Sequence, residues 1–196
     1  MLRPNAIRTR AGLVAVSCLF GLGFWQLGQA AYIPAKAWLA QELMQRAWQK
    51  VRHGEIESRP WPWADTWPVA RLSAKGGNVE LIVLAGGSGR TLAFAPGHLS
   101  VSALPGTKGN SIIAGHRDTH FQFLQYLTVG ESLMIETAGG DYHLYRVTDI
   151  DVVDSRRGSI VIDTDTPMLS LVTCYPFGAR RAGGPWRYVV TAMMIL

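Results

Sequence analysis

The sequence predicts a mainly β domain of the barrel or sandwich class. From residue 69 onward, short runs of strand-like composition alternate with turn clusters rich in Gly and Pro, and the helical pieces between them are short. The helical pieces are expected at 93–99 and 121–127. The extended runs cover residues 69–73, 79–84, 111–114, 133–137, 142–153, 160–163, 169–175 and 187–196.

The composition fits one domain with appendages in a chain of 196 residues. Charged residues make up 17% and apolar residues 48%, which is enough for a core and too apolar for disorder. Seven basic residues and one acidic residue precede position 55, whereas twelve basic and thirteen acidic residues follow. The excess positive charge therefore belongs to the N-terminal part, and no nucleic-acid partner is expected for the main domain.

Residues 11–33 carry no charge, and 23 helical residues suffice to cross a hydrocarbon core of about 30 Å. Because three arginines precede this segment, we expect a cytoplasmic basic tail at 1–10 and a single-pass anchor at 11–33. The anchor would lie in the inner (cytoplasmic) membrane, with the main domain in the periplasm or otherwise outside the cytoplasm. The alternative is a cleaved signal peptide, but the apolar run is longer than a signal sequence needs.

Residues 34–58 are expected to form a juxtamembrane amphipathic helix and a linker. Apolar residues recur every fourth position at Leu39, Leu43, Ala47 and Val51, so a helix is predicted over 35–53. Its basic face suits membrane lipid headgroups, and packing on the main domain is an equally good alternative. A Pro- and Trp-rich stretch then leads into the barrel domain, expected at 59–196.

Cys174 is the one cysteine outside the N-terminal apolar segment, so no disulfide can form within the domain. A lone thiol in an exported domain is exposed to oxidants, which marks it as a candidate reactive group. His116 can raise the thiolate fraction, and Arg187 can stabilise an oxyanion. The three residues lie 58 and 13 positions apart, each at the end of a predicted strand. They would meet if these strand ends share one rim of a barrel.

Three runs in this order resemble the signature blocks of the sortases, a family of membrane-anchored cysteine transpeptidases. They are GNSIIAGHR at 109–117, LVTC at 171–174 and RYVV at 187–190. The resemblance covers about residues 66–196 and implies an eight-stranded sortase-type β-barrel. The following residues, DT at 118–119 and YPF at 175–177, are similar to the class D-like branch and to sortases of Gram-negative bacteria. Ser170 departs from the family pattern, where Thr is common.

The resemblance implies an enzyme of the hydrolase class, a thiol protease. It would cleave a peptide bond with its cysteine and then form a new amide bond, which is transpeptidation. Cys174 would attack a carbonyl in an LPXTG-like C-terminal sorting signal, carried by a protein substrate with a membrane tail. His116 would protonate the leaving amine and then deprotonate an amine acceptor, while Arg187 would hold the substrate or the oxyanion. Residues expected to touch substrate are Thr173, Tyr175 with its N–H as a second oxyanion donor, Arg117, His120 and Arg180.

No cofactor and no metal site are predicted. His116 and His120 are four residues apart with Asp118 between them, but Gly115 precedes the pair and the Glu of helical zinc sites is absent. Two alternatives to the transpeptidase stay open. One is a cysteine hydrolase that releases the acyl group to water. The other is a non-enzymatic, membrane-anchored β-domain for adhesion or assembly, in which Cys174 is buried and inert.

Overall fold

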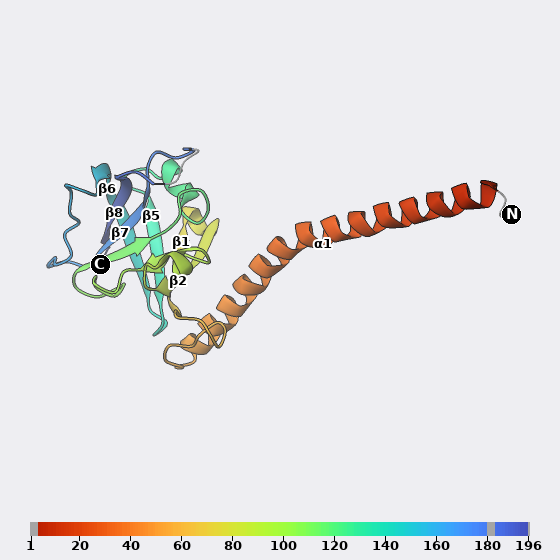
Figure 1. The fold of residues 1–196 in the computed structure, drawn as a ribbon. Coiled ribbons are helices and arrows are strands. Elements are labelled where there is room, and N and C mark those ends of the chain that lie inside the picture. The colour runs from red at the N-terminus through yellow and green to blue at the C-terminus, as the bar shows by residue number, and fades with distance from the viewer. Residues whose placement is uncertain (1–3, 180–182, 196) are drawn as a thin grey trace. The chain divides into compact units, whose positions relative to one another are not determined.

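The described part of the chain contains a long helix and a closed barrel of eight strands (Figure 1). The computed structural model describes residues 4–179 and 183–195. The helix is α1 (Pro4–Arg52). The strands are β1 (Pro68–Ala74), β2 (Val79–Ala85), β3 (Gly97–His98), β4 (Asn110–Ala114), β5 (Ser132–Thr137), β6 (Tyr142–Asp154), β7 (Met168–Cys174) and β8 (Trp186–Met194).

The order of strands around the barrel is β1-β2-β3-β4-β7-β8-β6-β5, and pairing of β5 with β1 closes it. The pairs β2–β3 and β4–β7 are parallel, and the others are antiparallel. The predicted eight-stranded barrel is therefore confirmed. The parallel pairing of β4 with β7 matters most for function. Cys174 is the last residue of β7, and His116 lies two residues after the end of β4.

Two short elements differ from the prediction. Residues 160–163 form no strand, although their composition is apolar. The segment at 93–99, predicted as helix, contains β3 instead, and the helical turn α2 (Gly89–Leu92) lies just before it. The predicted helix at 121–127 is present as the 3-10 helix η2 (Gln122–Tyr126). A second 3-10 turn, η1 (Lys75–Gly77), joins β1 to β2.

The barrel interior is filled by alternate residues of every long strand, as the pleat of a β-sheet requires. Ile113 of β4, Leu171 of β7 and Val190 of β8 are all fully buried in this core. Their sequence neighbours therefore point outward. This alternation decides which side chains at the ends of β4, β7 and β8 can face a substrate.

The helix α1 runs without interruption through Pro34, so the prediction of a separate helix beginning after this proline was wrong. Proline removes one backbone hydrogen bond, but the alanines around it are the strongest helix formers. The helix ends before Gly54, as predicted, and Gly54 adopts a left-handed φ of 94°. The chain divides into two compact units, Met1–Gln41 and Glu42–Leu196.

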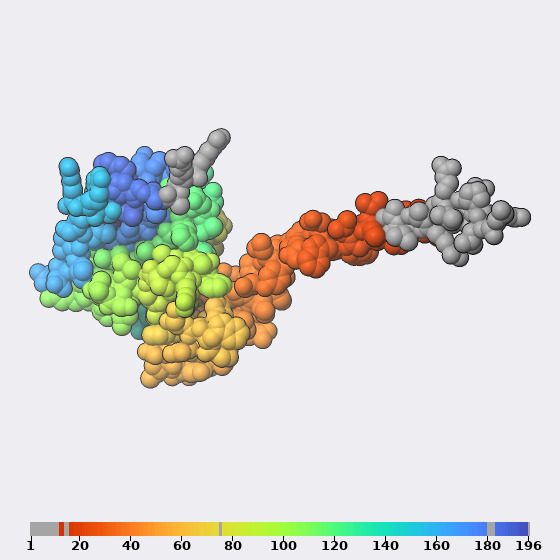
Figure 2. Space-filling model, viewed as in Figure 1, coloured from red at the N-terminus to blue at the C-terminus, as the bar shows by residue number. Residues whose placement is uncertain are grey.

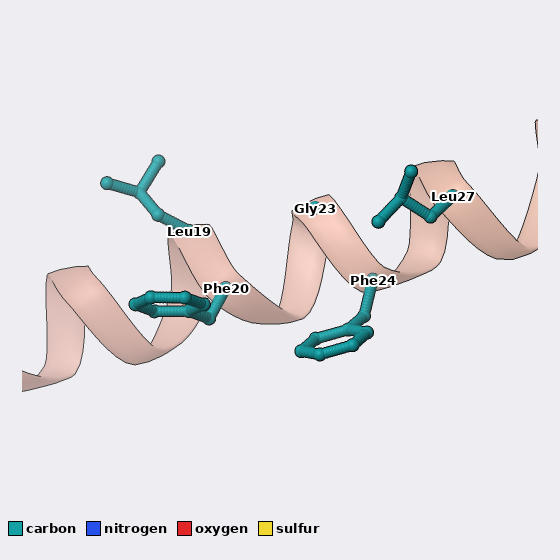
Figure 3. Close-up of a pocket in the computed structure, with 5 residues that line it drawn as sticks. All are labelled: Leu19, Phe20, Gly23, Phe24 and Leu27. Atoms are coloured by element: carbon teal, nitrogen blue, oxygen red, sulfur yellow. The ribbon is translucent and has the colours of Figure 1, made fainter.

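Within the first unit, large apolar side chains of α1 are exposed. Leu19, Phe20, Phe24 and Leu27 line a shallow depression beside Gly23 (Figure 3). Among the helices of the described residues, none is both long and apolar enough to cross a membrane. The anchor expected at 11–33 therefore stays a prediction.

Within the second unit, the last turns of α1 cover the outer face of β2. Met44 and Trp48 are buried against Ile82 and Leu84. At the helix end, Arg52 pairs with the buried carboxylate of Glu136 at 3.0 Å. Two alternatives were predicted for the helix at 35–53, contact with lipid headgroups or packing on the main domain. The structure shows that the last turns of this helix pack on the barrel.

Candidate active site

Cys174 ends β7 and lies directly opposite Arg187, near the start of β8. The Cβ atoms of directly opposed residues in an antiparallel pair are about 4.5–5.5 Å apart. Since Leu171 and Val190 point inward, Cys174 and Arg187 point outward by alternation. Both residues are partly exposed. The thiol and the guanidinium therefore share one area of the outer barrel surface.

His116 lies just after β4, the strand that pairs with β7. In the parallel β4–β7 pair, Ala114 is the partner of Val172, and the Gly115 N–H extends the ladder by donating to the Val172 carbonyl at 3.1 Å. His116 follows the last residue of β4 by two positions, as Cys174 follows Val172 in β7, and His116 is exposed. The segments that carry the imidazole, the thiol and the guanidinium thus belong to the adjacent strands β4, β7 and β8 or directly follow them, which is consistent with the predicted common rim.

A buried hydrogen bond connects the histidine and cysteine segments. The Thr173 hydroxyl donates to the Gly115 carbonyl at 2.7 Å, and Thr173 is 2% exposed because it points into the barrel. The residue before the thiol is thereby bound to the residue before the imidazole. Thr173 was predicted to touch substrate, but its burial makes it a positioning residue instead.

The turn after His116 explains why glycine stands at position 115. A Cβ atom at this position would lie 2.8 Å from the ring of Phe121, which is fully buried. The Phe121 N–H donates to the His116 carbonyl at 3.0 Å and closes the turn. Any larger residue at 115 would push this ring away and displace the imidazole.

Comparison with known proteins agrees with this arrangement. The family model of the sortase domain matches residues 72–195. The chain belongs to the sortase family. Sortase D of Bacillus subtilis (strain 168) is 31% identical over 114 residues, which are 58% of this chain and 57% of that protein. This chain thus matches little more than half the length of that relative, and the similarity is consistent with the predicted class D-like branch.

Solved sortase structures share the fold. A Sortase D5 transpeptidase of Clostridium perfringens superposes with a TM-score of 0.65 at 22% identity, covering 80% of this chain and 98% of that one. Sortase C1 of Streptococcus agalactiae gives a TM-score of 0.57 at 27% identity, covering 66% of this chain and 68% of that one. Sortase A of Corynebacterium diphtheriae, a lid mutant, gives 0.60 at 23%, covering 80% of this chain and 93% of that one.

In this sortase, two arginines hold the connection from β7 to β8, residues 175–185. Arg117 is 4% exposed and donates from Nη2 to the Ala179 carbonyl at 2.9 Å. Arg187 donates from Nη1 to the Gly184 carbonyl at 2.8 Å. The predicted substrate contact of Arg117 does not fit its burial, and we interpret it as a loop anchor. Arg180, also expected to touch substrate, lies outside the described residues.

Tyr175 corrects one detail of the predicted oxyanion site. Its N–H donates to the Trp186 carbonyl at 3.0 Å within the β7–β8 pair, so it does not serve as a second oxyanion donor in this structure. The ring of Tyr175 instead stacks on Tyr188 at 6.2 Å, and Phe177 meets Tyr188 edge-on at 5.1 Å. No sequence pattern indicated this aromatic cluster, because it depends on pairing across two strands.

His120 lies beside His116 and is partly buried. Burial lowers the pKa of His120 below its ordinary value of 6.5, and the charge of protonated His116 lowers it further, while a hydrogen bond to the backbone of Phe94 opposes both. Its position fits a residue at the edge of the site. Among the described side chains, no three of His, Cys, Asp or Glu gather closely enough to hold a metal ion.

The first prediction concerns the bond between Thr173 and Gly115. Thr173→Val keeps the shape but leaves a buried carbonyl without its donor, at a cost of about 1–3 kcal/mol in unfolding free energy. Misplacement of the thiol should also slow thioester formation about ten- to hundredfold. Thermal denaturation and single-turnover acylation measure the two effects. Thr148→Val, which removes an exposed hydroxyl bonded to the Thr191 carbonyl, is the control and should change neither.

The second prediction concerns the pH dependence of stability. When the pH lies between the lowered pKa of folded His120 and 6.5, His120 binds more protons in the unfolded chain than in the folded one. The contribution of His120 to stability is therefore complete above about pH 6.5 and is lost as the pH falls toward the folded pKa. His120→Gln should remove this acid-side loss, as measured by Tm from about pH 5 to about pH 8. The exposed His53→Gln is the control, and identical pH profiles for wild type and His120→Gln would contradict the prediction.

Proposed function

We propose that this sortase cleaves a C-terminal LPXTG-like sorting signal through a thioester on Cys174 and transfers the acyl group to an amine. The observation that carries the proposal is that Cys174, at the end of β7, lies opposite Arg187 of β8, while the exposed His116 follows β4, the other neighbour of β7. A thiol in this position is accessible from solvent, whereas the non-enzymatic alternative required it to be buried in the core.

The chemistry follows from the three side chains. The Cys174 sulfur attacks the scissile carbonyl, and His116 donates a proton to the amine that leaves. An incoming amine then gives its proton to His116 and attacks the thioester, which releases the sulfur and forms the new amide. Arg187 stabilises the negative oxygen in both steps, because a guanidinium keeps its charge and carries five N–H donors.

The outer surface next to the three residues suits an extended peptide. One level further along the strands, Ala114, Val172 and Val189 form an apolar strip on the same face, of which Ala114 and Val172 are partly exposed. At the next level Ser170 is buried, so the accessible part of the strip ends before it. We propose that the acyl part of the sorting signal lies along this strip.

We also propose that residues 11–33 anchor the protein in the inner membrane with the barrel outside the cytoplasm. The support is the uncharged stretch with arginines before it and the exposed apolar side chains of α1. Contact of the helix with membrane lipid belongs to the same proposal, and so does a substrate with a membrane tail. The Gram-negative affiliation stays a prediction from the sequence.

The third prediction tests the reaction itself. The purified protein, mixed with an LPXTG-peptide library, should form a covalent adduct on Cys174 that mass spectrometry detects. Cys18→Ser, in which the second cysteine is removed, should form the same adduct, whereas Cys174→Ala should form none. Addition of an amine should convert the adduct to a new amide. Release of free acid alone, with and without amine, would favour the hydrolase, and an adduct in neither case would contradict the proposal.

The fourth prediction concerns Arg187. Loss of one oxyanion donor typically costs about two to three decades in kcat, so Arg187→Ala should slow acylation by about this factor. Arg187→Lys keeps the charge but not the planar donors, and should recover only part of the rate. The exposed Arg156→Ala is the matched control. Since Arg187 also holds Gly184, circular dichroism must show that each variant is folded. A folded Arg187→Ala with unchanged acylation would exclude the proposed role.

A further inference from the structure

The loop before β4 contains a sequence that matches most of the signal this sortase is proposed to cleave. Residues 104–107 read LPGT, and Lys108 and Gly109 follow. Leu, Pro and Thr stand at the first, second and fourth positions of an LPXTG-like signal, and Lys108 takes the place of its final Gly. Nowhere else in the sequence does Leu precede Pro. The chain therefore carries one candidate copy of its own proposed substrate.

The bond that would be cleaved lies at the protein surface. Leu104 is 58% exposed, Thr107 is exposed, and the Lys108 side chain is 70% exposed. Pro105 between them is buried. Exposed loop tips are the usual places at which proteins are nicked. Exposure alone would thus leave the Thr107–Lys108 bond open to attack.

The conformation of the loop opposes such an attack. The Thr107 N–H and the Thr107 hydroxyl both donate to the Leu104 carbonyl, at 3.1 Å and 2.7 Å. A turn of this kind holds its first and fourth Cα atoms within about 7 Å, whereas an extended peptide separates them by about 10 Å. A peptide that lies along the apolar strip beside Cys174 is extended, so the folded turn does not fit there.

A buried tyrosine fixes the turn from inside the barrel. The Tyr145 side chain is fully buried, and its hydroxyl accepts a hydrogen bond from the Gly106 N–H at 2.9 Å. Gly106 adopts a left-handed φ of 86°, and a Cβ atom there would collide with the ring of His143. The Ala103 N–H donates to the Asn110 carbonyl at 3.2 Å and closes the loop at its base. The loop is therefore held at its middle and at its base.

The loop and the active site lie at opposite ends of β4. The loop enters the strand at Asn110, whereas His116 follows its other end, about 20 Å away at the rise of an extended chain. In Figure 2 the light-green surface around residues 95–110 lies below the dark-blue surface of the last strand. A folded barrel therefore does not bring its own loop to its own thiol, and cleavage requires a second copy.

We propose that residues 104–107 are a latent cleavage site for Cys174 of a second copy of this chain, and that the Tyr145 contact keeps the site closed. This inference rests on the proposed function. It assigns to the LPGT run the role of an internal substrate, and to Tyr145 the role of a residue that protects the protein from its own activity.

The reaction uses the steps proposed for the sorting signal. The Cys174 sulfur of one copy bonds to the Thr107 carbonyl carbon of the other, the Thr107–Lys108 bond breaks, and His116 gives a proton to the leaving nitrogen. Water then gives a proton to His116 and attacks the thioester. The carbon–sulfur bond breaks, which frees the thiolate and leaves a carboxylate on Thr107.

The fifth prediction first tests the sequence without the turn. The peptide SALPGTKGN, which corresponds to residues 102–110, should acylate wild-type Cys174 and be cleaved between Thr and Lys. The control peptide SAPLGTKGN, in which Leu and Pro are exchanged, should not react. Mass spectrometry of the peptide products and of the acyl-enzyme measures both.

The same prediction then tests the closed loop in the full-length protein. Tyr145→Phe removes the acceptor of the Gly106 N–H, so the loop should open and nicking into fragments 1–107 and 108–196 should be about tenfold faster. The exposed Tyr142→Phe is the control and should match wild type. The rate per molecule should rise with protein concentration. Cys174→Ala combined with Tyr145→Phe should stay intact alone and be nicked when wild type is added. Denaturing mass spectrometry detects the fragments.

The outcomes separate this inference from the proposed function. If an LPXTG peptide acylates Cys174 but SALPGTKGN does not, or if SAPLGTKGN reacts equally, the inference is overturned and the proposed function stands. Equal nicking of folded Tyr145→Phe and wild type would overturn the protective role of Tyr145. If Tyr145→Phe does not fold, the two peptides decide. Absence of an acyl-enzyme with every peptide would refute the proposed function, and this inference with it.

Discussion

The active site depends on the register between the parallel strands β4 and β7. Ala114 is paired with Val172, the Gly115 N–H continues the ladder, and the Thr173 hydroxyl closes it from inside the barrel. A shift by one residue would turn either the imidazole or the thiol into the core, because side chains alternate between the faces of a sheet. Every chemical step proposed above requires this register.

The same register separates two tasks among neighbouring residues. Inward residues such as Thr173 and Phe121 are buried and hold the backbone of the site in place. Outward residues, His116 and Cys174, are accessible and face the proposed peptide strip. Arg117 contributes from a third direction, because its buried guanidinium fixes the connection that follows the cysteine. Thr173 and Arg117 belong to the same sequence motifs as the candidate catalytic residues, but they hold the backbone of the site in position.

Irregular segments show where local sequence patterns stop being informative. The run at 160–163 has the composition of a strand, yet side-chain and backbone donors of Asn110 take its carbonyls in place of a neighbouring strand. At 93–99 the sequence predicted a helical piece, but the segment contains the strand β3. The two residues of β3 are too few to produce a periodic pattern. In α1, the continuation through Pro34 reflects the helix-favouring residues on both sides rather than the proline signal.

Local patterns were enough to establish the β-rich class, most strand positions and the three candidate residues, because strand periodicity, turn residues and a lone cysteine can each be recognised within a short stretch of chain. Three motifs in order also supported the family. The folded barrel was needed to show that Cys174 lies opposite Arg187, that the Tyr175 N–H is already bonded and that Thr173 is buried. Strand register and hydrogen-bond partners are set between segments tens of residues apart, and no local pattern records those pairings.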